Sequence, residues 1–289
     1  MSTKQSIMNL KIFTLSLALT FSTLFLSAQT TVPALITSDQ TWTAANSPYL
    51  INQNTYIDSG VTVTMMPGAE LIGSGAYRRL TVDGALNVLG SRDSLVKISG
   101  LQLAYSPKSA DYHRSVGKEV AIQFADIKGT GVANRVFHLN GSIDFTIKNS
   151  KIDSGYYGIF YQTKFGVLGH LTIDSCEIYG IKGSINQGSV LYIVGTNADV
   201  SITNSIVGYG RTLYLNGDLN IENTTFKELN AIQMGSTASK RKVLRCNRFE
   251  NSGEVKFLLQ ESNGSDYVEF TGNKIDSGHT SLHLSYSGS

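Results

Sequence analysis

Carboxylates recur at one position of a repeated sequence pattern, where they could bind a cation. Asp144, Asp199 and Asp218 each stand three residues before a short apolar segment. If these segments stack as neighbouring strands, Asp199 and Asp218 lie about 5 Å apart, and calcium prefers such oxygen ligands. However, His170 occupies the same position between Asp144 and Asp199, and aspartate is also a common turn residue. We therefore predict no metal and no other cofactor, with calcium at Asp199 and Asp218 as the alternative.

Aromatic side chains recur at a second position, which the alternation of apolar residues places on the outside of a strand. Aromatic rings cover the apolar faces of sugars, and amides hydrogen-bond to their hydroxyl groups. The predicted ligand-binding residues are Phe160, Tyr192, Tyr214, Gln162, Asn216 and Arg211. The alternative is that the aromatic residues stack only to stabilise the sheet.

No catalytic motif stands out. Nothing in the sequence matches a nucleophile elbow, and no pairing of histidine with aspartate has an evident third ligand. If the protein cleaves a glycan, Arg211 near Tyr192 and Tyr214 is the candidate acid–base residue, with Asp199 and Asp218 as metal ligands.

These positions belong to an internal repeat of about 25 residues. Its first segment has six positions: an apolar residue, any residue, two small polar residues, any residue and a second apolar residue. The copies are IKNSKI (147–152), IDSCEI (173–178), ITNSIV (202–207), IENTTF (221–226), LRCNRF (244–249) and FTGNKI (270–275), with a looser copy at 122–127. A second short segment follows each copy after a turn of variable length, as is typical of a solenoid.

Residues at the same position of successive copies form a column. Because side chains alternate along a strand, each column points either into or out of the solenoid. Two columns of the second segment are apolar or aromatic throughout and are predicted to point inward: Phe137, Ile159, Leu191, Leu213, Ile232, Phe257 and Leu282, then Leu139, Tyr161, Ile193, Leu215, Met234, Leu259 and Leu284. The inward column of the first segment is Ile122, Ile147, Ile173, Ile202, Ile221, Leu244 and Phe270. We expect Asn149, Asn204 and Asn223, two residues further on, to stack and to hydrogen-bond from turn to turn.

Short alternating strands at this period predict a parallel β-helix, because a propeller blade is longer and the leucine-rich signature is missing. The repeat resembles the right-handed parallel β-helix of the pectate-lyase-like superfamily, and GVTVTMMPGAELIGSGAYRRLTVDGALNVLGS (60–91) resembles the opening coils of secreted bacterial β-helix proteins. The resemblance implies an all-β fold, a single right-handed parallel β-helix (β-solenoid) of about ten coils.

The resemblance also sets an expectation about chemistry. Lyases of the superfamily hold calcium on stacked carboxylates and use Arg or Lys as the base, whereas its hydrolases use clustered aspartates with His and an Arg-x-Lys step. The sequence contains none of the steps DD, GHG, NTD or RIK. The resemblance therefore implies an architecture and leaves the activity open.

The chain is organised in three parts. Residues 1–28 have lysines before an apolar run that ends in Ser-Ala-Gln, which predicts a cleaved signal peptide and a secreted or cell-surface protein. Residues 32–119 are expected to form less regular coils, with a cap and a polar loop at 106–118. Residues 120–289 are expected to form seven regular coils, and a partner or a missing segment is expected to cover the open C-terminal end.

The charge, the apolar segments and the cysteines of the sequence limit the classes of partner that we expect. A net charge of +2 without a concentrated basic face argues against nucleic acid, and no membrane span is expected after signal cleavage. Cys176 and Cys246 stand three coils apart, roughly 14 Å along the axis, whereas a disulfide needs Cα atoms within about 7 Å. We therefore predict two unpaired thiols.

Two classes of function follow. The first is a non-catalytic, secreted or cell-surface scaffold, an adhesin-like or glycan-binding module whose partner is a polysaccharide or surface glycan. The alternative is a polysaccharide lyase or glycoside hydrolase with an unrecognised active site.

Overall fold

The computed structural model describes residues 29–75, 77–117, 119–129, 135–153, 157–164, 166–180, 188–195, 197–235, 241–260, 267–276 and 281–287. The predicted signal peptide lies outside these residues. Within them, no helix is long and apolar enough to cross a membrane.

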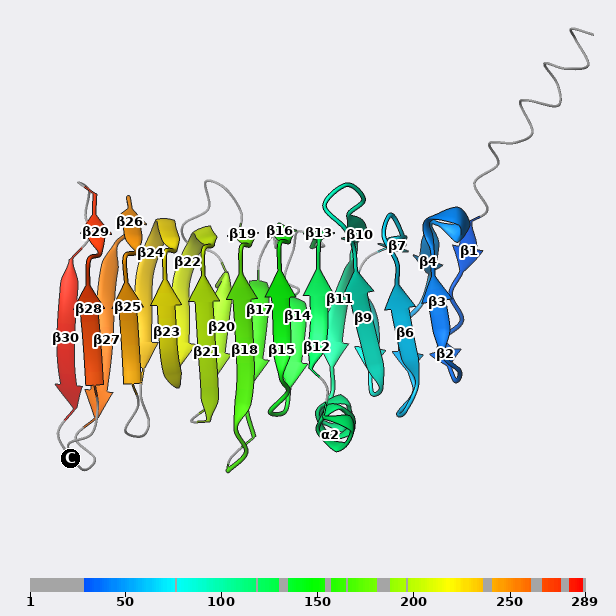
Figure 1. Cartoon of the computed structure of the whole chain (residues 1–289), viewed down its shortest axis with the longest axis horizontal. Helices are drawn as coiled ribbons and strands as arrows, with labels where there is room; N and C mark the ends of the chain where they lie inside the picture. Colours follow the sequence, from blue (N-terminus) through cyan, green and yellow to red (C-terminus); the bar gives the residue numbers. More distant parts are fainter. Residues whose placement is uncertain are drawn as a thin grey trace, which may run out of the picture.

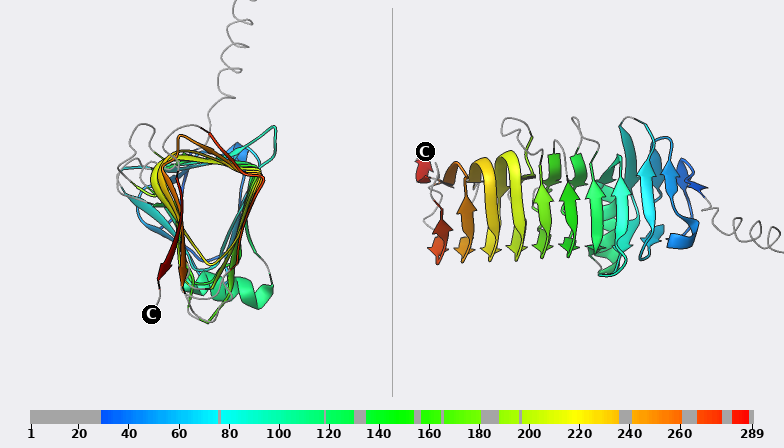
Figure 2. Two further views of the ribbon diagram at one scale, coloured as in Figure 1. Left: turned by 90° about the vertical axis from the view of Figure 1, so that its left-hand side faces the viewer. Right: turned by 90° about the horizontal axis from the view of Figure 1, so that it is seen from above.

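The chain winds as a right-handed parallel β-solenoid, which confirms the fold class (Figure 1). Each turn passes through three faces, seen end-on in Figure 2. The solenoid has about 8 turns, slightly fewer than the ten expected.

The first face is a ten-stranded parallel sheet. Its strands are β3 (Gln40–Trp42), β6 (Thr62–Met65), β9 (Ala85–Leu89), β12 (Val120–Gln123), β15 (Phe145–Lys148), β18 (Gly169–Asp174), β21 (Ala198–Thr203), β23 (Asp218–Glu222), β25 (Arg241–Arg245) and β28 (Tyr267–Thr271).

The second and third faces belong to one twenty-stranded sheet, because β22 (Ile206–Asn216) and β24 (Thr225–Gly235) run through both. The other strands of the second face are β1 (Thr30–Thr31), β4 (Tyr49–Ile51), β7 (Glu70–Gly73), β10 (Val96–Ser99), β13 (Ala125–Lys128), β16 (Lys151–Asp153), β19 (Glu177–Tyr179), β26 (Arg248–Glu250) and β29 (Lys274–Ile275). Those of the third face are β2 (Leu35–Ile36), β5 (Thr55–Ile57), β8 (Arg78–Val82), β11 (Leu101–Tyr105), β14 (Arg135–Asn140), β17 (Tyr157–Gln162), β20 (Leu191–Val194), β27 (Glu254–Gln260) and β30 (Leu282–Ser287).

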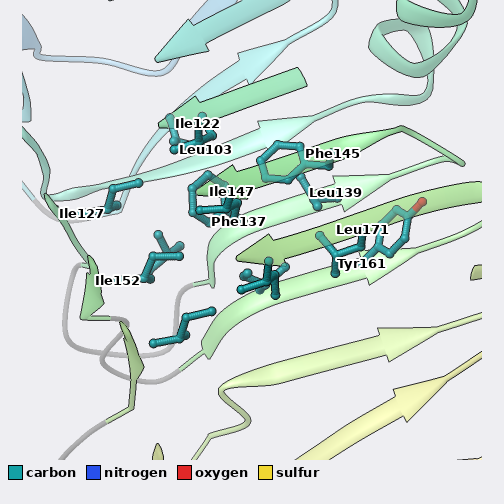
Figure 3. Packing of buried hydrophobic residues seen from close by; sticks show 14 of the residues in the cluster. Leu103, Ile122, Ile127, Phe137, Leu139, Phe145, Ile147, Ile152, Tyr161 and Leu171 are labelled. Carbon is teal, nitrogen blue, oxygen red and sulfur yellow. The ribbon is translucent and has the colours of Figure 1, made fainter. Parts of the chain in front are cut away.

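The core consists of stacked apolar columns. The isoleucines of the first-face column pair from turn to turn and are fully buried, and the aromatic residues Phe137 and Tyr161 fill the space opposite them (Figure 3). The inward assignment is therefore confirmed as far as β24. These side chains point inward because side chains alternate along a strand and one side of each strand carries apolar residues.

The register of β27 differs from the one inferred from sequence. Ile232 pairs with Val255, and Met234 pairs with Phe257, so the predicted columns are shifted by two residues there. A shift of two keeps the same side chains inward, so the apolar pattern allows both registers. In the observed register the preceding turn packs closely, because a Cβ at Gly253 would stand only 1.9 Å from the Asn230 carbonyl oxygen.

The predicted asparagine stack inside the solenoid is wrong. Asn149, Asn204 and Asn223 have φ of 50°, 51° and 51° at the corner between the first and second faces, and their side chains are exposed. Asparagine adopts this left-handed conformation more readily than most residues. Asn204 Nδ2 donates instead to Asp174 Oδ1 at 2.9 Å.

The buried polar column lies one residue later, at Ser150, Cys176, Ser205, Thr224 and Asn247. Ser205 Oγ accepts from the backbone N–H of Cys176 at 3.1 Å, and Asn247 Oδ1 accepts from that of Thr224 at 2.9 Å. Asn247 Nδ2 also donates to the Ile221 carbonyl at 2.9 Å. These side chains satisfy backbone groups that the bend at the corner leaves without a strand partner.

The expected loop at 106–118 is instead the helix α2 (Pro107–Val116), which follows β11 and lies at the lower edge of the solenoid in Figure 1. Ser106 caps it by accepting from two backbone N–H groups, Pro107 is its first residue, and Gly117 ends it at a φ of 63°. These are ordinary helix boundary signals. Ser109 Oγ holds the helix to the solenoid by donating to the Gly84 carbonyl at 2.7 Å.

The buried polar column predicts a measurable loss of stability. Asn247→Ala removes the acceptor for the Thr224 N–H and should lower the free energy of unfolding by about 2 kcal/mol. Asn220→Ala, on the exposed side of β23, is the control and should change it little. Urea unfolding of the two variants makes the comparison, and equal effects would contradict the proposed role of the column.

Candidate functional site

The predicted aromatic column lies on the outside of the third face. His138 pairs with Phe160, Phe160 with Tyr192, and Tyr192 with Tyr214, one residue in each of four successive turns. All four side chains are half-buried. We call these four residues the aromatic ladder.

The rings of the ladder contact one another along the solenoid axis. The Phe160 and Tyr192 ring centroids are 5.6 Å apart with planes at 11°, and those of Tyr192 and Tyr214 are 5.3 Å apart at 28°. His138 meets Phe160 edge-to-face at 5.1 Å. Strands in a sheet are separated by only about 4.8 Å, so the longer centroid distances show that the stacked rings are offset.

The flanking residues predicted for the site differ in availability. Gln162 is exposed beside Phe160, and Arg211 is exposed three residues before Tyr214. Asn216 is only 4% exposed, and its Oδ1 accepts from the Gly217 N–H at 3.0 Å. Asn216 therefore shapes a turn and does not present an amide to a ligand at the surface.

Arg135 was not included in the predicted site, but it lies directly on the ladder. Its guanidinium carbon is 3.7 Å from the centre of the Phe160 ring. Its Nη1 lies 3.3 Å from His138 Nε2. A guanidinium can only donate, so Nε2 accepts and the proton of the neutral ring lies on Nδ1.

The pKa of His138 is lowered from 6.5 to about 4, first by burial and then by the positive charges of Arg135 and Arg79. His138 is therefore neutral at pH 7. Arg79 lies two turns before Arg135 on the third face, and its place in the sequence does not mark it as part of the site. Only the pairing of β8, β11 and β14 indicates that Arg79 and Arg135 approach the same ring.

The predicted carboxylates meet on the first face. Asp199 pairs directly with Asp218 in the neighbouring strand, beside a pocket of about 210 Å³. His170 Nδ1 lies 2.7 Å from Asp144 Oδ1, and its Nε2 lies 3.9 Å from Asp199 Oδ2. In the described part of the chain, no group of three or more His, Cys, Asp or Glu side chains is arranged to hold a metal ion.

The carboxylates also have a structural role. Asp218 Oδ1 accepts from the Arg241 N–H at 2.7 Å, and Asp144 Oδ1 accepts from the His170 N–H at 3.1 Å. Each carboxylate thus binds the backbone N–H at the start of the next strand. A cation at Asp199 and Asp218 would have to take its other ligands from backbone oxygens and water.

The two cysteines lie at corners three turns apart and are both free thiols. Cys246 is exposed in the left-handed corner column, whereas Cys176 belongs to the buried polar column. Burial raises the pKa of the Cys176 thiol to about 11.

Comparison with known proteins adds little about function. No protein-family model and no curated protein matches the sequence. One solved structure, a double mutant of the periplasmic alginate epimerase AlgG, aligns with 83% of this chain and 77% of its own. Identity is 14% and the TM-score is 0.24, too low to support an argument about this chain.

The difference in burial predicts different thiol reactivity. Cys246 should react with a thiol reagent at pH 8 in the native protein, whereas Cys176 should react only after unfolding, because its thiolate is scarce and buried. The Cys246→Ser variant should therefore remain unlabelled until denaturant is added. Rapid labelling of that variant in its native state would contradict the placement of Cys176.

The lowered pKa of His138 predicts a pH dependence of stability. Between about pH 6.5 and pH 4 the unfolded chain binds a proton at His138 that the folded chain does not, so the free energy of unfolding falls as the pH falls through this range. The variant His138→Phe should show a shallower fall in urea unfolding at pH 6.5, 5.5 and 4.5. Parallel curves for the variant and the wild type would show that His138 titrates normally.

Proposed function

We propose that this protein is an exported β-solenoid that binds a polysaccharide along the aromatic ladder without cleaving it. The observation that carries the proposal is the ladder itself: four half-buried rings in successive turns, on the outside of a rigid face. A linear polymer laid along the axis meets one ring in each turn. Rings that are already packed lose little conformational freedom on binding.

The surroundings of the ladder support a sugar ligand. Apolar sugar faces contact the accessible parts of the half-buried rings, while the exposed Gln162 and Arg211 offer donors to hydroxyl groups at the margin. A binding surface of this kind fits a secreted or cell-surface protein, which the sequence at 1–28 predicts. A scaffold or adhesin-like role is compatible with the same surface.

The alternative, a polysaccharide lyase or hydrolase, is less well supported by the geometry. Glycoside hydrolysis commonly needs two carboxyl groups on either side of the scissile bond. Asp199 and Asp218 pair on the first face, whereas the ladder lies on the third. A polymer on the ladder would not reach them. Arg211 lies near the ladder, so the candidate base and the candidate metal ligands Asp199 and Asp218 stand on different faces.

Affinity gel electrophoresis through a panel of soluble polysaccharides tests this proposal. At least one polymer should retard the wild-type protein, and the Tyr192→Ala/Tyr214→Ala double variant should lose that retardation, because removing stacked rings typically costs about 1 kcal/mol or more each. Tyr267→Ala, an exposed tyrosine on the first face, is the control and should run like the wild type.

Two results would contradict the proposal. Equal retardation of the wild type and the folded double variant would leave the ladder as a sheet-stabilising stack. Shortening of the bound polymer during the assay would replace binding with the enzyme alternative.

A further inference from the structure

One residue at the corner between the first and second faces does not suit its backbone conformation. Six residues at this corner have φ between 50° and 55°: Phe124, Asn149, Ser175, Asn204, Asn223 and Cys246. Asparagine adopts this left-handed conformation more readily than most residues, whereas it is an outlier for a bulky side chain such as that of Phe124. A strained residue persists only where its surroundings require it, and such residues cluster at binding sites.

The Phe124 ring is not part of the core. Phe124 is half-buried, and the cluster of buried apolar side chains in the described residues does not include it. It lies instead on the wall of an open cavity of about 370 Å³ on the outside of this corner. Leu95, which is 39% exposed, lines the same cavity. The cavity therefore presents an apolar surface to solvent.

A short hairpin between β9 and β10 forms one side of the cavity. Ser91 and Ser94 exchange backbone hydrogen bonds at 3.0 and 3.1 Å, which closes the hairpin around Arg92. The hairpin packs closely on the corner, because a Cβ at Gly90 would stand only 2.1 Å from the Phe124 carbonyl oxygen. This packing holds the backbone of Arg92 beside the cavity before any ligand binds.

The charges around the cavity do not cancel. The lining side chains include the exposed cations Arg92 and Lys151 and one carboxylate, that of Glu177. In the described part of the chain, neither cation has a carboxylate within ion-pair distance. Asp126, which pairs with Lys151 in the neighbouring strand, has its carboxylate 3.9 Å from Lys128 instead. A site with an excess of one positive charge favours a ligand with one negative charge.

We propose that this cavity binds a small aromatic carboxylate, and that it does so independently of the aromatic ladder. The ligand ring packs against Phe124 and Leu95. Its carboxylate accepts charge-assisted hydrogen bonds from Arg92 and Lys151. The volume of the cavity is within the range of small-molecule sites.

Three probes test the inference by saturation-transfer-difference NMR at pH 7 and low salt. Benzoate combines the ring with the charge, benzamide has the ring alone, and acetate has the charge alone. Benzoate should bind with a dissociation constant of about 1 mM, as expected for a ligand of its size. Benzamide and acetate should each bind roughly tenfold more weakly. Absence of benzoate binding, or equal binding of benzoate and either other probe, would overturn the inference.

Variants of the two cations locate the site. Arg92→Gln/Lys151→Gln should weaken benzoate binding by roughly tenfold, because both charge-assisted hydrogen bonds are lost. Lys164→Gln/Lys256→Gln removes two positive charges outside the cavity and should bind benzoate like the wild type. Circular dichroism establishes that each variant is folded. Equal weakening by the two double variants would show general attraction and would overturn the inference.

The Phe124 position provides a second readout. Phe124→Asn introduces the residue that three other turns carry at this corner, so it should raise the urea midpoint of unfolding while benzoate binding is lost. Phe124→Tyr keeps the ring and should keep the binding. A lower midpoint for Phe124→Asn would show that the ring stabilises the fold, and full binding by that variant would show that the ligand does not contact the ring. Either result would overturn the inference.

Discussion

Backbone hydrogen bonding between successive turns is the constraint on which this structure depends. Parallel pairing places each residue directly over its counterpart about 4.8 Å away, so every position of the repeat becomes a column along the solenoid. A residue type that recurs at one position of the repeat therefore forms a continuous row along the axis. Isoleucine columns produce a continuous core, and a position that tolerates rings produces a stack.

The same constraint explains the corners. A turn can close only if the chain bends between faces, and the bend is made by left-handed residues such as Asn204 and Ser175. At this corner the residue after the bend is buried, and its polar side chain satisfies backbone groups in the neighbouring turn. Ser205 and Asn247 fulfil that role, so the interior at this corner is polar although the rest of the core is apolar.

The three faces use their outer columns in different ways. The second face pairs opposite charges, and the first uses carboxylates such as Asp218 to bind the N–H groups that begin the next strand. The third face carries the aromatic ladder on its outer side, with the Arg135 guanidinium stacked on Phe160. This difference is the physical reason for assigning ligand binding to the third face.

The sequence by itself determined the solenoid, the inward columns and the outward aromatic column, because a fixed period and strict alternation need no tertiary information. It also contained the boundary signals of α2, in Ser106, Pro107 and Gly117, although polarity suggested a loop. Other features were decided only by the tertiary structure. The register of β27 is ambiguous in sequence, because a shift of two residues preserves the apolar side.

The corner asparagines and the two arginines near His138 show the same limit. Two residues after an inward isoleucine, alternation predicts an inward side chain, but a positive φ at Asn149 turns that side chain outward. Arg79 and His138 are 59 positions apart in the sequence, and only the stacking of β8, β11 and β14 lets both guanidiniums act on one ring. Periodicity predicts which residues share a column. Long side chains that reach across columns are placed only by three-dimensional packing.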